Sequence, residues 1–190
     1  MGAWPWRRYA RGMTDGVRDE ARCLLLTGTV GAGKTTTASA VGDLLRERGV
    51  PHAVVDLDEL RRAWPAPPDD PFNSELERAN LAAVAANHRR AGAERLVLAG
   101  VVETPAMRAV YERCVGLPIV VCRLRVDLGR VRERLVGRHA PGVERDWHLH
   151  RSGELDRVLD DEEPADVVVD VADDPPAVVA AMVLNSIGWE

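Results

Sequence analysis

Five short, nearly continuous apolar runs recur along the chain, and segments with helical spacing separate them. The runs are Cys23–Thr27, Ala53–Asp56, Leu96–Val102, Ile119–Leu124 and Asp166–Asp170. A strand that is buried on both faces is apolar throughout rather than at alternate positions. We therefore predict a three-layer α/β domain, in which helices cover both faces of a five-stranded parallel sheet.

Helix signals lie between these runs. We expect helices over residues 34–48, 57–64, 74–91, 105 onwards, 127–137 and 175 onwards. Ser74 and Glu77 fit a capping box, in which two side chains bond to backbone N–H groups at a helix start. Residues 65–73 (PAPPDDPFN) are too rich in proline for a helix or a central strand, so we predict a loop there.

The strongest motif is Gly-Thr-Val-Gly-Ala-Gly-Lys-Thr at residues 28–35, which matches G-x4-G-K-[ST] without a mismatch. It follows the first apolar run and opens the first helix, the context in which this motif forms a phosphate loop. Its glycines let consecutive backbone N–H groups converge on phosphate oxygens at a helix N-terminus. The residues predicted to bind nucleotide are Gly28, Gly31, Ala32, Gly33, Lys34, Thr35 and Thr36.

Each polar residue of this loop has an expected role with ATP and Mg²⁺, the two predicted cofactors. Lys34 is expected to reach the β- and γ-phosphates and to take part in catalysis. Thr35 is expected to offer its hydroxyl to Mg²⁺, and Thr36 to contact the α-phosphate. The chance formation of such a glycine-rich turn is disfavoured by the strand and helix that flank it.

Composition narrows the class of nucleotide-binding protein. Of the 25 basic residues in this chain of 190, Lys34 is the one lysine and the others are arginines. Arginine and lysine differ in geometry and hydration, so the position that keeps lysine is a candidate functional position. Guanine readers of the N-K-x-D type need a second lysine and are excluded. A small kinase fits the remaining features best.

Charge and cysteine content exclude several other classes. The net charge of −5 gives no overall pull towards nucleic acid. No apolar run approaches the roughly 20 residues of a membrane helix. The three cysteines form no CxxC pair, which favours a cytoplasmic location. We expect an N-terminal extension at 1–20, poorly ordered, and one domain at 21–190 that is a monomer or a homodimer.

Acidic residues follow the second and third runs, where strand ends face the ligand crevice of a parallel sheet. Asp56 and Asp58 are two apart and so point the same way along an extended chain. Asp56 is expected to hold Mg²⁺ through water, and Asp58 to accept the proton of an acceptor hydroxyl. A helix-capping role for Asp58 is the alternative. Glu103 is expected to contact substrate or metal-bound water, or to serve structure alone.

The phosphate loop, the D-x-D-x-x-R segment at 56–61 and a later arginine-rich segment together resemble small-molecule kinases of the adenylylsulfate kinase type. Gluconate, shikimate and chloramphenicol kinases share this plan, and the resemblance spans about 22–189. It implies the P-loop nucleoside-triphosphate hydrolase fold, with Asp58 near the acceptor hydroxyl and Arg61 on an anionic part of the acceptor. The segment FNSELERAN at 72–80 carries the resemblance further and implies that Arg78 and Asn80 also bind the acceptor.

Arg130, Arg134 and Arg138 recur every four residues, so they form one stripe of a helix. The resemblance implies an arginine-rich lid over about 137–153, with Arg134 and Arg138 stabilising the charge of the transferring phosphoryl group. A solvated face is the alternative. His148 and His150 would face one way on an extended segment, as a metal site requires. No cysteine or third histidine with ligand-like spacing lies nearby, so a metal site is disfavoured.

The sequence thus predicts an ATP- and Mg²⁺-dependent phosphotransferase that acts on a hydroxyl of a small polar molecule. A nucleotide-binding switch or ATPase without a small-molecule acceptor is the alternative, because the third run does not end in the usual Walker B aspartate. A nucleoside or nucleotide kinase is a weaker alternative.

Overall fold

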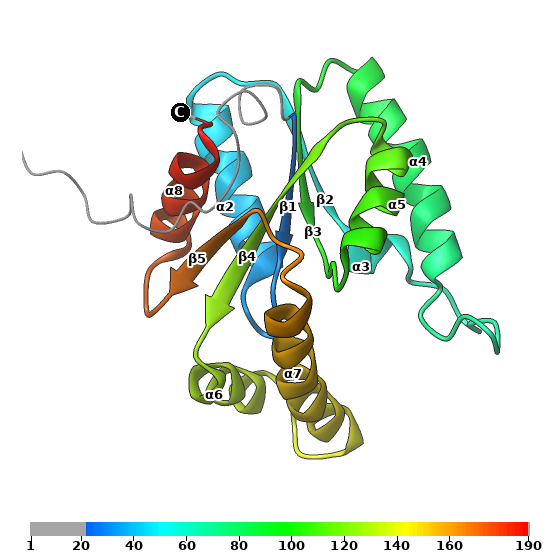
Figure 1. The fold of residues 1–190 in the computed structure, drawn as a ribbon, viewed down its shortest axis with the longest axis vertical. Helices are drawn as coiled ribbons and strands as arrows, with labels where there is room; N and C mark the ends of the chain where they lie inside the picture. The colour runs from blue at the N-terminus through cyan, green and yellow to red at the C-terminus, as the bar shows by residue number, and fades with distance from the viewer. Residues whose placement is uncertain (1–21, 190) are drawn as a thin grey trace, which may run out of the picture.

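A five-stranded parallel sheet forms the centre of the computed structural model, which describes residues 22–189 (Figure 1). The strands are β1 (Cys23–Thr27), β2 (His52–Asp56), β3 (Arg95–Ala99), β4 (Ile119–Val126) and β5 (Val167–Val171). Their order is β2-β3-β1-β4-β5, and all neighbours are parallel. The predicted three-layer architecture is confirmed. The predicted extension at 1–20 lies outside the described residues.

Helices cover both faces of this sheet and its carboxyl end. They are α2 (Lys34–Glu47), α3 (Leu57–Leu60), α4 (Ser74–Arg90), α5 (Pro105–Val115), α6 (Leu128–Arg138), α7 (Val143–Glu162) and α8 (Pro176–Ile187). Helices α2 and α8 lie side by side on one face, whereas α4 and α5 cover the other (Figure 1). Within residues 22–189, no helix is both long enough and apolar enough to cross a membrane.

Two apolar cores explain why the strand segments are apolar throughout. On β1, Leu24 and Leu26 pack into the core under α2 and α8. Cys23 and Leu25 alternate with them and pack into the core under α4 and α5. Because each face of the strand is buried, apolar side chains are favoured at successive positions rather than at alternate ones.

Two elements end earlier than the sequence predicts. Strand β3 ends at Ala99 rather than Val102, and the side chain of Leu57 fills the space beside the next residue. A Cβ on Gly100 would lie 2.4 Å from Leu57 Cδ1. Helix α3 ends at Leu60 rather than residue 64. The Asn73 side chain donates to the carbonyls of Arg61 and Ala63, at 3.0 Å each, and so fixes the chain in a turn there.

The predicted capping box at the start of α4 is wrong. Asn73, in the left-handed conformation with φ 51°, is the N-cap residue and makes no side-chain cap. The Asp70 carboxylate instead accepts hydrogen bonds from the backbone N–H groups of Ser74 (2.8 Å) and Glu75 (2.9 Å). These bonds lower the pKa of Asp70. The Glu77 side chain therefore does not cap the start of α4. It points inward and is buried.

Helix α7 is the element that the sequence does not predict. The resemblance implies a lid over about 137–153 but no secondary structure for it. The chain from Val143 to Glu162 is one continuous helix of 20 residues. His148 and His150 therefore lie on a helix rather than on an extended segment. Its buried side is formed by Ser152, Leu155 and Leu159.

A buried arginine attaches α7 to the sheet. Arg123 on β4 has a side chain only 6% exposed. Its Nη1 lies 2.7 Å from Asp160 Oδ1 and its Nη2 lies 2.9 Å from Asp156 Oδ1. A buried guanidinium is costly unless carboxylates pair with it, so these contacts hold α7 against β4. Arg125 on the same strand pairs with Asp170 instead, and both of those side chains are about half exposed.

Arg123→Met is expected to lower the free energy of unfolding by about 2–3 kcal/mol, because two carboxylates lose their buried partner. Arg125→Met on the same strand is the matched control. It removes an exposed pair and is expected to cost about 1 kcal/mol or less. Urea unfolding monitored by circular dichroism measures both values. Equal losses in the two variants would contradict the idea that Arg123 clamps α7.

Candidate active site

The phosphate loop connects β1 to α2, and two of its glycines are required by its geometry. A Cβ on Gly28 would lie 2.7 Å from the carbonyl oxygen of Leu124 on β4, which is too close for any side chain. Gly33 has φ 93° and is the N-cap residue of α2, in a conformation that favours glycine. The residue types of the motif therefore follow from the path of the backbone.

The N-terminus of α2 is open to an anion. Gly33 offers no side-chain cap, and the first turn of the helix contains no acidic residue. The N–H groups of that turn have no partners within the helix, and the helix dipole adds partial positive charge at the same end. Such an end binds phosphate without further adjustment.

Lys34 lies at this helix end with its ammonium group among backbone carbonyls. Its Nζ donates to Gly28 O at 3.0 Å and to Thr29 O at 3.1 Å. Burial lowers the pKa of Lys34 to about 8, although the nearby carboxylates of Asp58 and Asp56 favour its charged form. A phosphate group at the loop would give this ammonium the anionic partner that it lacks.

Thr35 and Asp56 are in direct contact, as expected for residues that share a metal site. Thr35 Oγ1 donates to Asp56 Oδ2 at 2.7 Å. The other carboxylate oxygen, Asp56 Oδ1, accepts from the backbone N–H of Asp58 at 2.9 Å and so caps α3. A hydroxyl beside a carboxylate is a set of hard oxygen donors, which fits Mg²⁺. Asp56 rather than Asp58 is thus the capping residue, and the alternative role considered for Asp58 is wrong.

A chain of polar contacts runs from Asp58 into the interior. Asp58 Oδ1 accepts a hydrogen bond from Arg61 Nη2. Arg61 Nε lies 3.1 Å from Glu77 Oε2, and Glu77 Oε1 accepts from the hydroxyl of Tyr111 at 2.5 Å. Burial raises the pKa of Glu77, and burial together with Glu77 raises the pKa of Tyr111. Arg61 is thereby held between one exposed and one buried carboxylate.

Sequence reasoning missed Glu77 as a site residue because it assigned this side chain to a capping box. A usable signal was present. Glu77, Leu81 and Ala85 recur every four residues, and all three are the buried positions of α4. A carboxylate on the apolar stripe of a helix needs an internal partner, which here is Arg61.

Arg78 and Asn80, both expected at the acceptor, lie on α4 next to this chain of contacts. Asn80 Nδ2 donates to the Leu60 carbonyl at 2.7 Å, so its amide fixes the end of α3. Arg78 is half-buried, and its positive charge opposes the rise in the pKa values of Glu77 and Tyr111 that burial causes. Asn80 thus positions the short helix that carries Asp58.

Glu103 and the phosphate loop both contact α7. Glu103 Oε1 lies 2.5 Å from Arg151 Nη2, and Arg151 also pairs with Glu154. The Thr29 hydroxyl of the phosphate loop donates to the carbonyl oxygen of Ser152 at 2.5 Å. Adjacent residues of α7 are therefore joined to the segment that follows β3 and to the phosphate loop. The sequence does not reveal these contacts, because α7 itself was not predicted.

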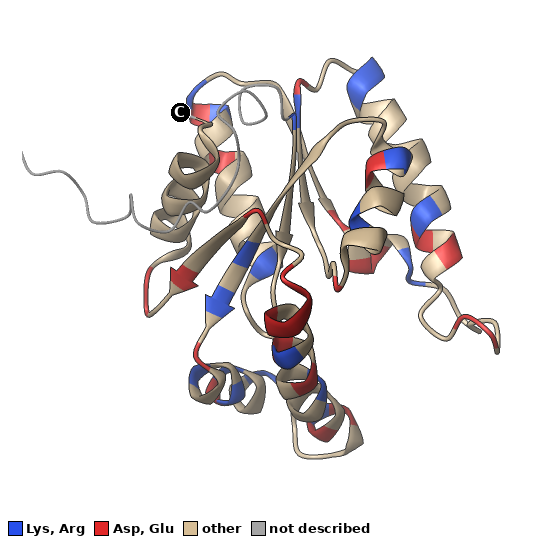
Figure 2. Cartoon of the chain, in the orientation of Figure 1, with Lys and Arg blue, Asp and Glu red and all other residues tan. Residues whose placement is uncertain are grey.

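The arginine stripe of α6 lies beside the connection between β5 and α8. Arg130 pairs with Asp173, and Arg134 Nη2 donates to Ala172 O at 3.3 Å. Arg138, at the last turn, is exposed. Figure 2 shows basic and acidic residues interspersed along α6 and α7. The expected stripe is present, and its first two members contact the neighbouring loop.

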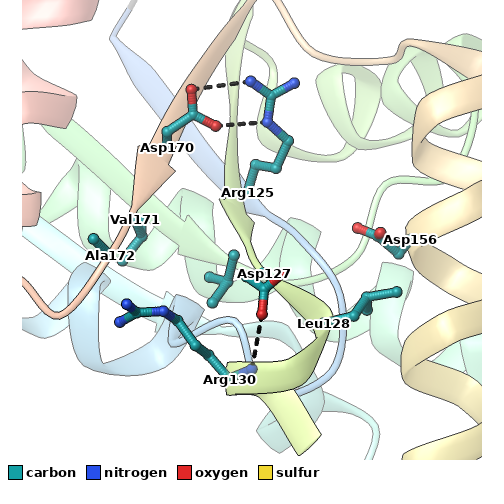
Figure 3. Close-up of a pocket in the computed structure, with 9 residues that line it drawn as sticks. Arg125, Asp127, Leu128, Arg130, Asp156, Asp170, Val171 and Ala172 are labelled. Atoms are coloured by element: carbon teal, nitrogen blue, oxygen red, sulfur yellow. Dashed lines mark hydrogen bonds and ion pairs between the residues drawn. The ribbon is translucent and has the colours of Figure 1, made fainter.

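A separate open cavity of about 570 Å³ lies where β4 and β5 end (Figure 3). Its lining includes the Arg125–Asp170 ion pair, together with Asp127 and Arg130 from the start of α6. Lys34 is not among its lining residues. The cavity is therefore distinct from the phosphate loop, and its opposed charges largely compensate one another.

The fold and the loop geometry are those of a P-loop nucleotide-binding protein. A family model described as adenylylsulphate kinase matches residues 20–109, just under half of the chain. No curated protein matches the chain.

Several solved structures, two of them of small kinases, share the fold. The tunicamycin resistance protein of Deinococcus radiodurans is 22% identical, with a TM-score of 0.63 over 88% of this chain and 96% of that one. The APS kinase of Mycobacterium tuberculosis, solved with AMPPNP and APS, is 20% identical, with a TM-score of 0.60 over 89% and 98%. A gluconokinase of Sinorhizobium meliloti is 20% identical, with a TM-score of 0.58 over 90% and 93%. The resemblance to small P-loop kinases is confirmed, and the family model and the fold together point to a P-loop kinase.

The lowered pKa of Lys34 implies a pH dependence of nucleotide binding. Phosphate binds the charged ammonium, and the free protein loses that charge as the pH rises through about 8. The affinity for ATP is therefore expected to fall about tenfold between pH 7 and pH 9. Titration calorimetry at several pH values measures this slope.

The variant Lys34→Arg provides the control, because a guanidinium stays charged throughout this range. Its affinity for ATP is expected to be weaker than that of the natural protein at pH 7 and nearly constant up to pH 9. The same slope in both proteins would show that another group titrates.

Proposed function

We propose that the protein transfers the γ-phosphoryl group of ATP to a hydroxyl of a small polar acceptor, with Mg²⁺ as cofactor. The observation that carries the proposal is the link from Thr35 through Asp56 to Asp58. One hydrogen-bonded unit joins the residue expected at the metal to the residue expected at the acceptor. Such fixed positioning is the main contribution that a protein makes to phosphoryl transfer.

The nucleotide half of the site consists of the phosphate loop and the start of α2. Backbone N–H groups of this turn bind the phosphate oxygens, and Lys34 neutralises charge between the β- and γ-phosphates. Thr35 and Asp56 would hold Mg²⁺, Thr35 directly and Asp56 through water. When bound, Mg²⁺ offsets the charge of the phosphate oxygens.

The acceptor half is built around Asp58 and Arg61. The Asp58 side chain is 64% exposed, so it is accessible to a bound molecule. Its carboxylate orients the acceptor hydroxyl and accepts its proton as the new P–O bond forms. Arg61 faces the same side of α3 and binds an anionic group of the acceptor. Glu77 holds Arg61 from behind, as a positioning residue.

Helices α6 and α7 form the lid in this proposal. The expected lid at 137–153 corresponds to the end of α6, the connection at 139–142 and the first half of α7. Arg134 and Arg138 stabilise the negative charge on the transferring group when the lid lies over the loop. Closure also keeps out water, which competes with the acceptor as nucleophile.

Transfer of label from γ-labelled ATP to a panel of hydroxyl-bearing metabolites and antibiotics, with Mg²⁺ present, tests the proposal. A labelled small product supports it. Release of inorganic phosphate with every acceptor would favour the nucleotide-dependent ATPase or switch instead. Labelled nucleoside phosphates would identify a nucleoside or nucleotide kinase.

Asp58→Asn is expected to lower the transfer rate by about 10²–10⁴-fold, because the amide cannot accept the hydroxyl proton. ATP affinity is expected to change little, since the Asp58 backbone N–H still binds Asp56. Glu59→Gln is the matched control on the same short helix, where Glu59 forms an exposed pair with Arg62. Steady-state rates and ATP titrations measure both effects. A rate for Asp58→Asn close to that of Glu59→Gln would contradict the assigned role.

A further inference from the structure

The junction between α6 and α7 brings two imidazoles and a carboxylate together. His139 ends α6, and Glu144 and His148 lie on the first turns of α7. His139 Nδ1 is 3.5 Å from Glu144 Oε1, and His148 Nε2 is 3.8 Å from the same oxygen. One ligand atom from each of the three residues lies within 4.8 Å of the other two. The sequence gives no hint of this group, because its members become neighbours only when α7 is helical.

These separations suit a tetrahedral metal ion. Bonds of about 2.0–2.2 Å from zinc to nitrogen and oxygen place neighbouring ligand atoms roughly 3.4 Å apart. The two measured separations to Glu144 Oε1 exceed that spacing by less than half an ångström. Glu144 has a side chain 78% exposed, so its carboxylate has room to adjust to a bound ion.

The two histidine rings stack with centroids 4.4 Å apart. Nε2 of His148 is the nitrogen beside Glu144, whereas the buried Nδ1 of this ring has no hydrogen-bond partner among the described residues. Burial, followed by the neighbouring His139, lowers the pKa of His148. Arg138 acts in the same direction, and Glu144 opposes it.

We propose that His139, Glu144 and His148 bind one divalent transition-metal ion of the zinc class. Two imidazoles and one carboxylate suit zinc, cobalt or nickel, whereas Mg²⁺ prefers oxygen ligands alone. The site is therefore distinct from the Mg²⁺ site at Thr35 and Asp56. Three protein ligands leave a fourth position for water.

The bound ion would join the end of α6 to the start of α7 across the connection at 139–142. Arg138 immediately precedes the first ligand, His139. The metal would thus fix the part of the lid that carries this arginine. The binding site itself does not depend on the proposed phosphotransferase activity, and metal binding can be measured without any acceptor.

Titration of the untagged protein with Zn²⁺ and Co²⁺ tests the proposal directly. Calorimetry is expected to show one equivalent bound, and Co²⁺ is expected to give the visible absorption of a tetrahedral ion. His139→Ala and His148→Ala are each expected to weaken binding by roughly tenfold or more. His150→Ala is the matched control, because His150 lies on the same helix, is exposed and does not belong to the group. It is expected to bind as the natural protein does.

A second measurement does not depend on whether the histidine variants fold. The Trp147 ring lies edge-on to His148, with centroids 4.9 Å apart. Bound Co²⁺ is expected to quench the fluorescence of Trp147, and Trp147→Phe is expected to remove the quenched component. Absence of metal binding, equal losses in His150→Ala and His148→Ala, or quenching that persists in Trp147→Phe would each overturn the proposal. Thiolate bands in the cobalt spectrum, assigning the metal to the cysteines, would do the same.

Discussion

Close packing around the phosphate loop is the constraint on which the rest of this structure depends. Gly28 lies against the Leu124 carbonyl on β4, and a Cβ on Gly31 would lie 3.3 Å from both Val131 and Leu135 of α6. The loop is therefore enclosed by the neighbouring strand and by the helix that follows it. This enclosure sets the direction of α2, and with it the position of the helix end where Lys34 and Thr35 lie.

The same packing joins the phosphate loop to the arginine-bearing helices. Helix α6 packs on the loop through Val131 and Leu135, whereas α7 reaches it through the hydrogen bond from Thr29 to Ser152. Arg123 then fixes the second half of α7 to β4. A change at the loop when phosphate binds therefore reaches α6 and α7 through direct contacts. In the proposed function, movement of the lid would be coupled to occupancy of the loop by this packing rather than by a flexible tether.

The features that local sequence pattern determines were predicted, and those that depend on distant partners were not. Five strands and the phosphate loop follow from apolar runs and from a motif within eight residues. Helix α7 was not predicted for two reasons. Ser152 interrupts the apolar stripe on its buried side, and the residue that holds it to the sheet, Arg123, lies over thirty residues earlier in the sequence. Glu77 was misassigned because its partner Tyr111 lies on another helix. The roles of the candidate site residues remain predictions, although Thr35, Asp56, Asp58 and Arg61 do lie in one chain of contacts.

Lysine is replaced by arginine throughout this chain except at position 34, where the geometry requires an ammonium group. At an exposed position, arginine replaces lysine at little cost because solvent accommodates either group. Lys34 instead extends into a turn where Nζ contacts two adjacent carbonyls, Gly28 O and Thr29 O. A planar guanidinium is wider and presents its donors in a fixed fork, so it does not fit between these carbonyls and a phosphate group at once. Burial that lowers the pKa of Lys34 follows from the same enclosure. The single lysine of the chain and its lowered pKa thus have one physical explanation, the small space that the loop leaves for a single positive charge.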